Sequence, residues 1–261
     1  MKILVCIKQV PIVEELLELD TEKKWLSDTD VEYRINRFDE FAIEEALLIK
    51  ETTKGTTVDV ISFGPQRVET VLRRAMGMGA DNGIHIEDET EGFINPLTIA
   101  TLIGQYAQNN DYDLIFTGIM SEDSMQSLVG PMLASYLNLP CAVSVVETKL
   151  DEKTEKISVK CELEGGHYQN VRLNLPSVST IQSGINKPRY PSLSNMLRAN
   201  KQDLINIDIN SLKKPQTNEK ILNISLPERS KKIKFLEGSM EEKAEELIQL
   251  LHKKAILRGN L

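Results

Sequence analysis

The loop from residue 118 to residue 130 carries the residue types best suited to binding a ligand. It reads GIMSEDSMQSLVG, is flanked by Gly118 and Gly130, is rich in serine and acidic residues, and leads into a predicted helix. Backbone N–H groups at a helix start attract phosphate, and Ser124 and Ser127 would add hydroxyl donors. The loop matches neither GxGxxG nor GxxxxGK[ST]. These residues alone leave two interpretations open: a phosphate-binding loop, or an ordinary strand-to-helix turn.

Two clusters of charge are open to more than one interpretation. The predicted helix at 36–51 carries the acids Asp39, Glu40, Glu44 and Glu45. A solvated acidic face explains them more simply than acid–base chemistry, which would need a facing partner that the sequence does not identify.

The second cluster is basic. Arg189, Arg198 and Lys201 lie near three apolar residues, Leu193, Met196 and Leu197. Apolar residues ringed by basic ones can form a docking site, although a packed surface helix explains the pattern more simply.

Cysteine and histidine give no sign of a metal site. Cys6, Cys141 and Cys161 are far apart, and so are the three histidines. No CxxC pair is present, so three reduced, mostly buried thiols in a reducing compartment are expected. No metal ligand and no catalytic residue is predicted.

Short apolar runs alternate with amphipathic segments along the first 150 residues. The predicted strands are 3–7, 58–63, 82–86, 114–117 and 141–147, and the predicted helices are 36–51, 66–77, 96–109 and 130–136. This alternation is typical of an α/β fold with a doubly wound, mostly parallel sheet. Ligands bind beyond the carboxyl ends of such strands, which here are the segments 6–11, 63–65 and 118–130.

The pattern changes after residue 150. Alternating strands are predicted at 156–161 and 168–173, joined as a hairpin, with another strand at 178–182. A short helix at 192–201 and a clear amphipathic helix at 240–257 follow. We expect an α/β domain over residues 1–189 and, over residues 190–261, an arm that packs on another surface.

Composition excludes several classes of protein. The chain has 261 residues, 41% of them hydrophobic, and a net charge of -8, which argues against a general nucleic-acid binder. Its apolar runs fall short of the roughly 20 residues that span a bilayer. The apolar start is too short for a signal peptide. A cytoplasmic protein without direct membrane insertion is expected.

Four segments spread over the chain share the pattern of one family. They are MKILVCIKQVP at the start, NRFDEFAIEEAL in the first helix, GPQRVETVLRRAMGMGADNGIHI, and LPSVSTIQSGINKPRYPSLSNMLRA, which is the most specific. Their spacing is compatible over nearly the whole chain. Together they resemble the beta (small) subunit of electron-transfer flavoproteins.

The resemblance implies a Rossmann-like, adenine-nucleotide-binding subunit of a heterodimer. In that family the large (alpha) subunit carries the FAD that accepts electrons, and the beta subunit binds AMP in most members. In flavin-bifurcating members the beta subunit holds a second FAD and NADH docks nearby. Acyl-CoA dehydrogenases and related flavoenzymes are typical electron donors or acceptors.

The resemblance also implies the site residues. Nucleotide contacts are expected at Cys6, Asn36, Arg37, Phe38, Asp39, Phe63, Asp123, Ser124, Met125, Gln126, Ser127, Leu128, Val129, Gly130, Pro131, Met132, Leu133 and Ala134. Partner docking is expected at Leu193, Met196, Leu197 and Arg198, and contact with the large subunit at Glu162.

The chain departs from the family in the loop at 118–130. Ile119, Met120, Met125, Gln126 and Leu128 replace several polar residues of the family loop, while Asp123, Val129 and Gly130 remain. Arg37 replaces the usual proline. These changes leave the choice between AMP and a second FAD open.

The hypothesis from the sequence is an electron-carrier subunit that positions flavins and performs no acid–base chemistry. One alternative is a bifurcating subunit that oxidises NADH on its own FAD. The other is a separate nucleotide-binding or ATP-hydrolysing module, against which the missing Walker lysine argues.

Overall fold

The computed structural model describes residues 1–12, 19–20, 25–27, 31–90, 92–219, 221–226, 233 and 235–254. Met1–Ile224 form one compact unit and Ser225–Leu261 a second. The division into a domain at 1–189 and an arm that packs on a large subunit stays a prediction. Among the described residues no helix has both the length and the apolar character needed to cross a membrane.

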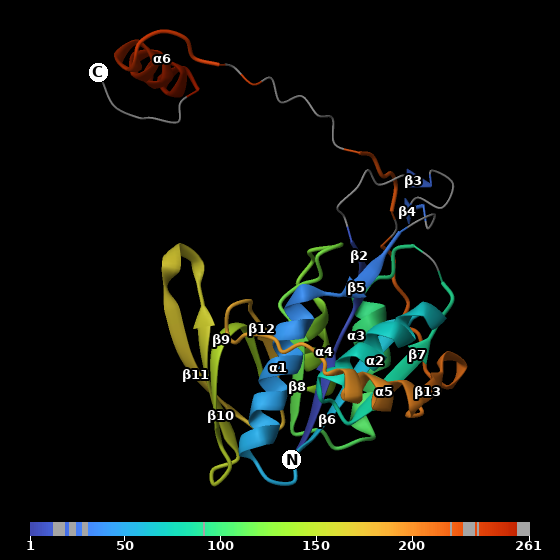
Figure 1. Cartoon of the computed structure of the whole chain (residues 1–261). Coiled ribbons are helices and arrows are strands. Elements are labelled where there is room, and N and C mark those ends of the chain that lie inside the picture. Colours follow the sequence, from blue (N-terminus) through green and yellow to red (C-terminus); the bar gives the residue numbers. More distant parts are fainter. Residues whose placement is uncertain are drawn as a thin grey trace. The chain divides into compact units, whose positions relative to one another are not determined.

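A nine-stranded sheet runs through the first unit (Figure 1). Its order is β11-β10-β9-β12-β8-β1-β6-β7-β13. The strands are β1 (Lys2–Cys6), β6 (Thr57–Gly64), β7 (Asn82–Glu87), β8 (Leu114–Gly118), β9 (Cys141–Asp151), β10 (Lys156–Glu162), β11 (Tyr168–Asn174), β12 (Ser177–Ile181) and β13 (Ile205–Asp208). Pairing is parallel from β9 through β13, and only β9-β10 and β10-β11 are antiparallel. The predicted α/β fold class is confirmed.

Helices cover both faces of this sheet. One face carries α1 (Arg37–Thr52), the short η1 (Gln66–Val68), α2 (Glu69–Met78) and α5 (Leu193–Lys201), and the other carries α3 (Pro96–Gln108) and α4 (Val129–Leu137). Ile3 and Val5 pack under the first group, and Leu4 and Cys6 under the second. This alternation explains why β1 is apolar from Ile3 to Cys6: a parallel strand buried on both faces has no solvent side.

Local sequence sets where the helices begin and end. Helix α3 begins at Pro96, which is preorganised for a first turn, and the side chain of Asn95 accepts a hydrogen bond from the N–H of Leu97 at 2.8 Å. Helix α2 ends at Gly79, whose φ of 138° suits a residue without a side chain.

Two small sheets and three short helical turns complete the first unit. Strand β2 (Gln9–Pro11) pairs with β5 (Tyr33–Ile35), and β3 (Leu19–Asp20) pairs with β4 (Trp25–Leu26). The turns are η1, η2 (Glu164–Gly166) and η3 (Ile209–Ser211). None of the four short strands was expected from sequence.

The segment after residue 190 contributes to the first unit. Helix α5 packs on α2, where the side chain of Met196 fills the space beside Gly77, and β13 extends the sheet beside β7. In the second unit, α6 (Met240–Lys253) begins with a capping box between Ser239 and Glu242. The predicted end of this helix at 257 lies outside the described residues.

The order of the strands reverses beside β1. From β1 the chain continues to β6 and β7 on one side, then returns to β8 on the other. Helix α1, which follows β1, and helix α4, which follows β8, lie on opposite faces. A crevice therefore opens between the carboxyl ends of β1 and β8, which is where doubly wound sheets bind their ligands.

Candidate functional site

A cavity of about 200 Å³ lies at this crevice. Its wall is drawn from the segments 6–11, 33–39, 63–68, 92–103 and 117–130, together with Trp25 and Thr90. All three segments that the sequence marks as strand ends therefore meet at one cavity.

Asp39 ties together the two strand ends that border the crevice. Its Oδ2 accepts a hydrogen bond from the backbone N–H of Lys8 at 2.7 Å, and its Oδ1 accepts one from Gly118 at 3.0 Å. Burial raises the pKa of the Asp39 carboxyl to about 7, even though these N–H donors act in the opposite direction. A side chain at Gly118 would meet Asp39 and, at 2.7 Å, the Cβ of Phe38, so glycine permits this close approach.

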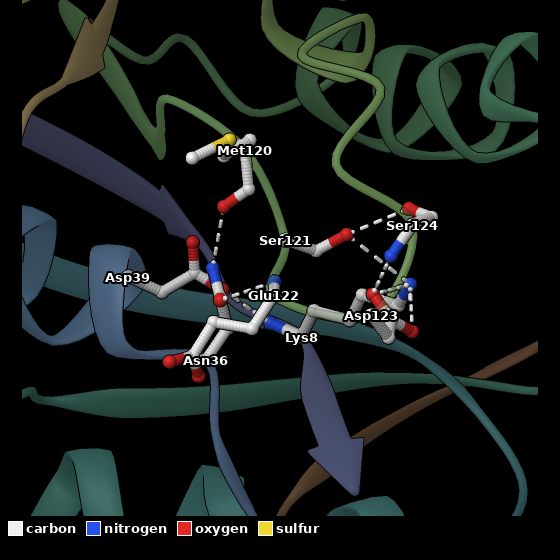
Figure 2. Close-up of polar contacts among 8 residues, drawn as sticks. All are labelled: Lys8, Asn36, Asp39, Met120, Ser121, Glu122, Asp123 and Ser124. Carbon is white, nitrogen blue, oxygen red and sulfur yellow. Dashed lines mark hydrogen bonds and ion pairs between the residues drawn. The ribbon is translucent and has the colours of Figure 1, made fainter. Parts of the chain in front are cut away.

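Asn36 holds the first part of the loop at 118–130 (Figure 2). Its Nδ2 donates to the carbonyl of Met120 at 2.8 Å, and its Oδ1 accepts from the N–H of Glu122 at 3.1 Å. Its own backbone N–H donates to the carbonyl of Lys8 at 2.8 Å. One buried amide therefore joins the start of α1 to both neighbouring loops.

Lys8 and Asp123 hold the middle of the loop (Figure 2). The Lys8 Nζ lies 2.6 Å from Oδ2 of Asp123, and Oδ1 of Asp123 accepts from the N–H of Ser124 at 2.8 Å. The hydroxyls of Ser121 and Ser124 are 2.8 Å apart. Burial alone would raise the pKa of Asp123, but the charge of Lys8 and the hydrogen bonds lower it below its usual range. The loop is thus held by Lys8 and Asn36 together with hydrogen bonds of its own.

The start of helix α4 offers unoccupied donors. Leu128, at its N-cap position, makes no side-chain capping bond. Because Pro131 has no N–H, the donors that this first turn can offer to an anion are the backbone N–H groups of Val129 and Gly130. Gly130 brings this turn against the sheet, since a Cβ there would lie 2.5 Å from Thr180 Cγ2 and 2.8 Å from Thr117 Oγ1.

Apolar groups supply the rest of the wall. Cys6 ends β1, and burial, followed by the nearby charge of Asp39, raises the pKa of its thiol, which is therefore neutral. Phe63 lies near the end of β6, half-buried, beside Gly64, whose carbonyl is 2.9 Å from Nε2 of His85. Burial also raises the pKa of Cys141 and Cys161, in agreement with three unreactive thiols.

The structure brings most of the predicted nucleotide residues together. The cavity wall contains Cys6, Asn36, Asp39, Phe63, Asp123, Ser124, Gln126, Ser127, Leu128, Val129 and Gly130. The other predicted residues, Arg37, Phe38, Met125, Pro131, Met132, Leu133 and Ala134, are outside that wall. Leu133 and Ala134 are buried residues of α4, whereas Met125 is 65% exposed. Their contact with a nucleotide stays a prediction.

Several residues of the cavity wall were not predicted from the sequence. Arg67 stacks on Tyr33, with its Cζ 4.4 Å from the ring centroid, and both line the cavity. Trp25 and Phe93 also line it, with ring centroids 6.5 Å apart. The single tryptophan was the one available signal, because the other three stand in segments without a binding motif.

The expectation of a solvated acidic face on α1 is wrong for three of its four acids. Asp39, Glu44 and Glu45 are all buried. Arg189 binds both oxygens of Glu44 at 2.8 Å, and Asn186 donates to Glu45 at 2.9 Å. These partners stand more than 140 residues away in sequence, so the helical pattern could not reveal them.

The predicted docking residues lie outside the cavity on a firmly held helix. Leu193 and Leu197 are 78% and 56% exposed, Arg198 is exposed, and Met196 is half-buried against α2. Nη1 of Arg73 donates to the carbonyl of Ala199 at 2.9 Å. Leu193 and Leu197 therefore stand in solvent on a fixed support.

Glu162 lies at the end of β10, also outside the cavity wall. Its Oε2 accepts a hydrogen bond from Nε2 of Gln182 at 3.2 Å. The described residues contain no group of acidic, histidine and cysteine side chains that could hold a metal ion.

Comparison with known proteins identifies the family. The electron transfer flavoprotein domain model matches residues 24–212. The chain belongs to the electron transfer flavoprotein family. It is 31% identical to the electron transfer flavoprotein subunit beta of Methylophilus methylotrophus over 97% of this chain and 98% of that protein. The beta subunit of Bacillus subtilis is also 31% identical, over 98% and 99% of the two chains.

The likeness extends to animal members of the family. The electron transfer flavoprotein subunit beta of Bos taurus is 30% identical over 78% of this chain and 80% of that protein. These relatives bear the name of the beta subunit over nearly their full length or most of it. The chain is accordingly a beta-type member of a family of electron-transfer proteins.

Proposed function

We propose that the chain is the beta subunit of a heterodimeric electron transfer flavoprotein and holds an adenine nucleotide in the cavity between β1 and β8. With its large (alpha) subunit it helps to pass electrons between acyl-CoA dehydrogenase-type flavoenzymes and other redox partners. The observation that carries the proposal is the cavity at the reversal of strand order, walled by the three segments at the strand ends.

The residues of the cavity fit AMP. Cys6 and Phe63 give an apolar wall for a base, and the uncapped first turn of α4 gives N–H donors for a phosphate. The hydroxyls of Ser124 and Ser127 stand in the same wall. In this proposal AMP is a structural ligand, and the FAD of the large subunit supplies the redox chemistry when bound.

The residues of this chain act by positioning. Asp39, Asn36 and Lys8 hold the loop at 118–130 in the wall. Glu162 contacts the flavin domain of the large subunit, and Leu193, Met196, Leu197 and Arg198 dock the dehydrogenase. The heterodimer works in the cytoplasm.

A second candidate function has one observation in its favour. A further cavity of about 290 Å³ shares Trp25, Phe93, Asp123, Ser124 and Gln126 with the first. Two adjoining cavities offer room for a ligand larger than AMP, such as a second FAD. The chain would then be a flavin-bifurcating subunit that oxidises NADH on its own FAD.

Co-production with the large subunit tests the proposal. We expect the two chains to purify as a stable heterodimer whose flavin is bleached by an acyl-CoA dehydrogenase and its substrate. Bleaching by NADH alone would favour the bifurcating form. A chain that purifies alone, well folded, and hydrolyses ATP would contradict both.

A further inference from the structure

We propose that Arg67 binds the phosphate of the adenine nucleotide and thereby gives the cavity its preference for a phosphorylated ligand. The inference rests on the proposed nucleotide site and adds the residue that recognises the charge of the ligand. Arg67 is in the cavity wall, in the η1 turn that follows β6.

The loop that starts helix α4 has no positive charge of its own. Residues 118–130 contain Glu122 and Asp123 but no lysine or arginine. Backbone N–H groups can bind a phosphate, but they do not neutralise it. A cation from another segment would have to offset both the loop acids and the ligand.

Two basic side chains from neighbouring elements are already paired with those acids. Nζ of Lys8 lies 2.6 Å from Oδ2 of Asp123, and Nη2 of Arg34 lies 3.2 Å from Oε1 of Glu122. Each pair cancels one acid of the loop. The loop is thereby made neutral, but neither cation remains unpaired for a ligand.

Arg67 differs from both. It makes no ion pair with a carboxylate in the described part of the chain, and its guanidinium lies over the ring of Tyr33 at 4.4 Å. Stacking uses the face of a guanidinium and leaves the N–H groups at its edge available. That edge matches phosphate oxygens and can bind two of them at once.

The backbone of Arg67 is fixed against the loop that follows β1. Nε2 of Gln9 donates to the carbonyl of Arg67 at 3.0 Å and to Oγ1 of Thr70 at 3.1 Å. The N–H of Val68 donates to the carbonyl of Pro65 at 2.9 Å. The arginine is therefore held at the cavity by contacts that do not involve its side chain, so changing the side chain should leave the wall intact.

The test compares AMP with adenosine, which lacks only the phosphate. Dissociation constants would be measured by calorimetry on the full chain purified with its large subunit and freed of nucleotide. Arg67→Gln should weaken AMP binding about tenfold and adenosine binding less than about twofold, as expected for loss of one charged hydrogen-bonding group. Arg74→Gln is the matched control, because Arg74 pairs with Glu40 at 3.5 Å outside the cavity wall.

Two results would overturn the inference while leaving the nucleotide site in place. In the first, Arg67→Gln binds AMP as tightly as the unchanged protein. In the second, AMP and adenosine are weakened equally, which would mean that Arg67 only supports the wall. Failure of the unchanged protein to bind either ligand would overturn the nucleotide site itself.

Discussion

The carboxylate of Asp39 lies 3.0 Å from the backbone N–H of Gly118, across the crevice at which the order of the strands reverses. Its second oxygen accepts a hydrogen bond from the backbone N–H of Lys8 at 2.7 Å. A single buried side chain of α1 therefore holds the ends of β1 and β8 at a fixed separation. The shape of the cavity depends on this contact.

Asp39 should make stability depend on pH. Burial raises its pKa from 3.8 to about 7, so between about pH 4 and pH 7 the folded state binds more protons than the unfolded state. The free energy of unfolding should therefore fall as pH rises through this range. Asp39→Asn should remove this pH dependence. Because the change also loses one hydrogen-bond acceptor, it should lower the free energy of unfolding by about 1–3 kcal/mol at pH 5.

Urea denaturation at several pH values checks this expectation. Asp203→Asn, a change at an exposed aspartate, should keep the pH dependence of the unchanged protein. An identical pH profile for Asp39→Asn and the unchanged protein would show that Asp39 does not carry the effect.

Asn36→Ala should loosen the loop at 118–130. The change removes the bonds to Met120 and Glu122 at 2.8 and 3.1 Å and leaves two part-buried backbone groups without these partners. A loss of about 1–3 kcal/mol in the free energy of unfolding is expected, together with weaker nucleotide retention. Asn109→Ala, on an exposed helix end, should cost less than about 0.5 kcal/mol. Equal costs for the two variants would contradict the role of Asn36.

Trp25 should report on the cavity by fluorescence. It is the single tryptophan of the chain and stands in the cavity wall beside Phe93. Because aromatic rings stack on a nucleotide base, AMP should quench its emission in proportion to occupancy. Trp25→Phe should abolish the signal while AMP still binds by calorimetry. Emission that stays constant at saturating AMP would place the ligand elsewhere.

Leu193→Ala should impair the docking of the dehydrogenase without affecting the fold. Leu193 is 78% exposed, so its loss should change the free energy of unfolding by less than about 0.5 kcal/mol. Because Leu193 is proposed to be an apolar anchor, its replacement by alanine should raise the KM for the dehydrogenase about tenfold and leave the flavin content unchanged. Asn200→Ala, an exposed change on the same helix, is the control for stopped-flow assays. Equal transfer rates for both variants and the unchanged protein would exclude the docking role.

The main elements could be predicted because their signals are local. The apolar run of β1 and the amphipathic pattern of α1 each follow from burial of their own residues. Strand β13 and the pairs β2–β5 and β3–β4 could not, because strands of two to four residues are too short to show a pattern and form only beside a partner strand.

Part of the candidate site could likewise be predicted from the sequence, and part could not. Three parts of the site lie at the carboxyl ends of strands: Cys6, Phe63 and the loop at 118–130. The rule for doubly wound sheets and the family resemblance both predict them. The Lys8–Asp123 pair spans 115 residues, and the bond from Gln9 to the carbonyl of Arg67 spans 58. Such contacts depend on tertiary structure and have no pattern in the sequence.

The nucleotide content of the purified heterodimer tests the central claim most directly. The chain would be purified with its large subunit, denatured, and its released FAD and AMP quantified by chromatography. The account predicts one FAD and one AMP per heterodimer, whereas two FAD and no AMP would favour the bifurcating form. Purification without a large subunit and without any adenine nucleotide would contradict the proposed function.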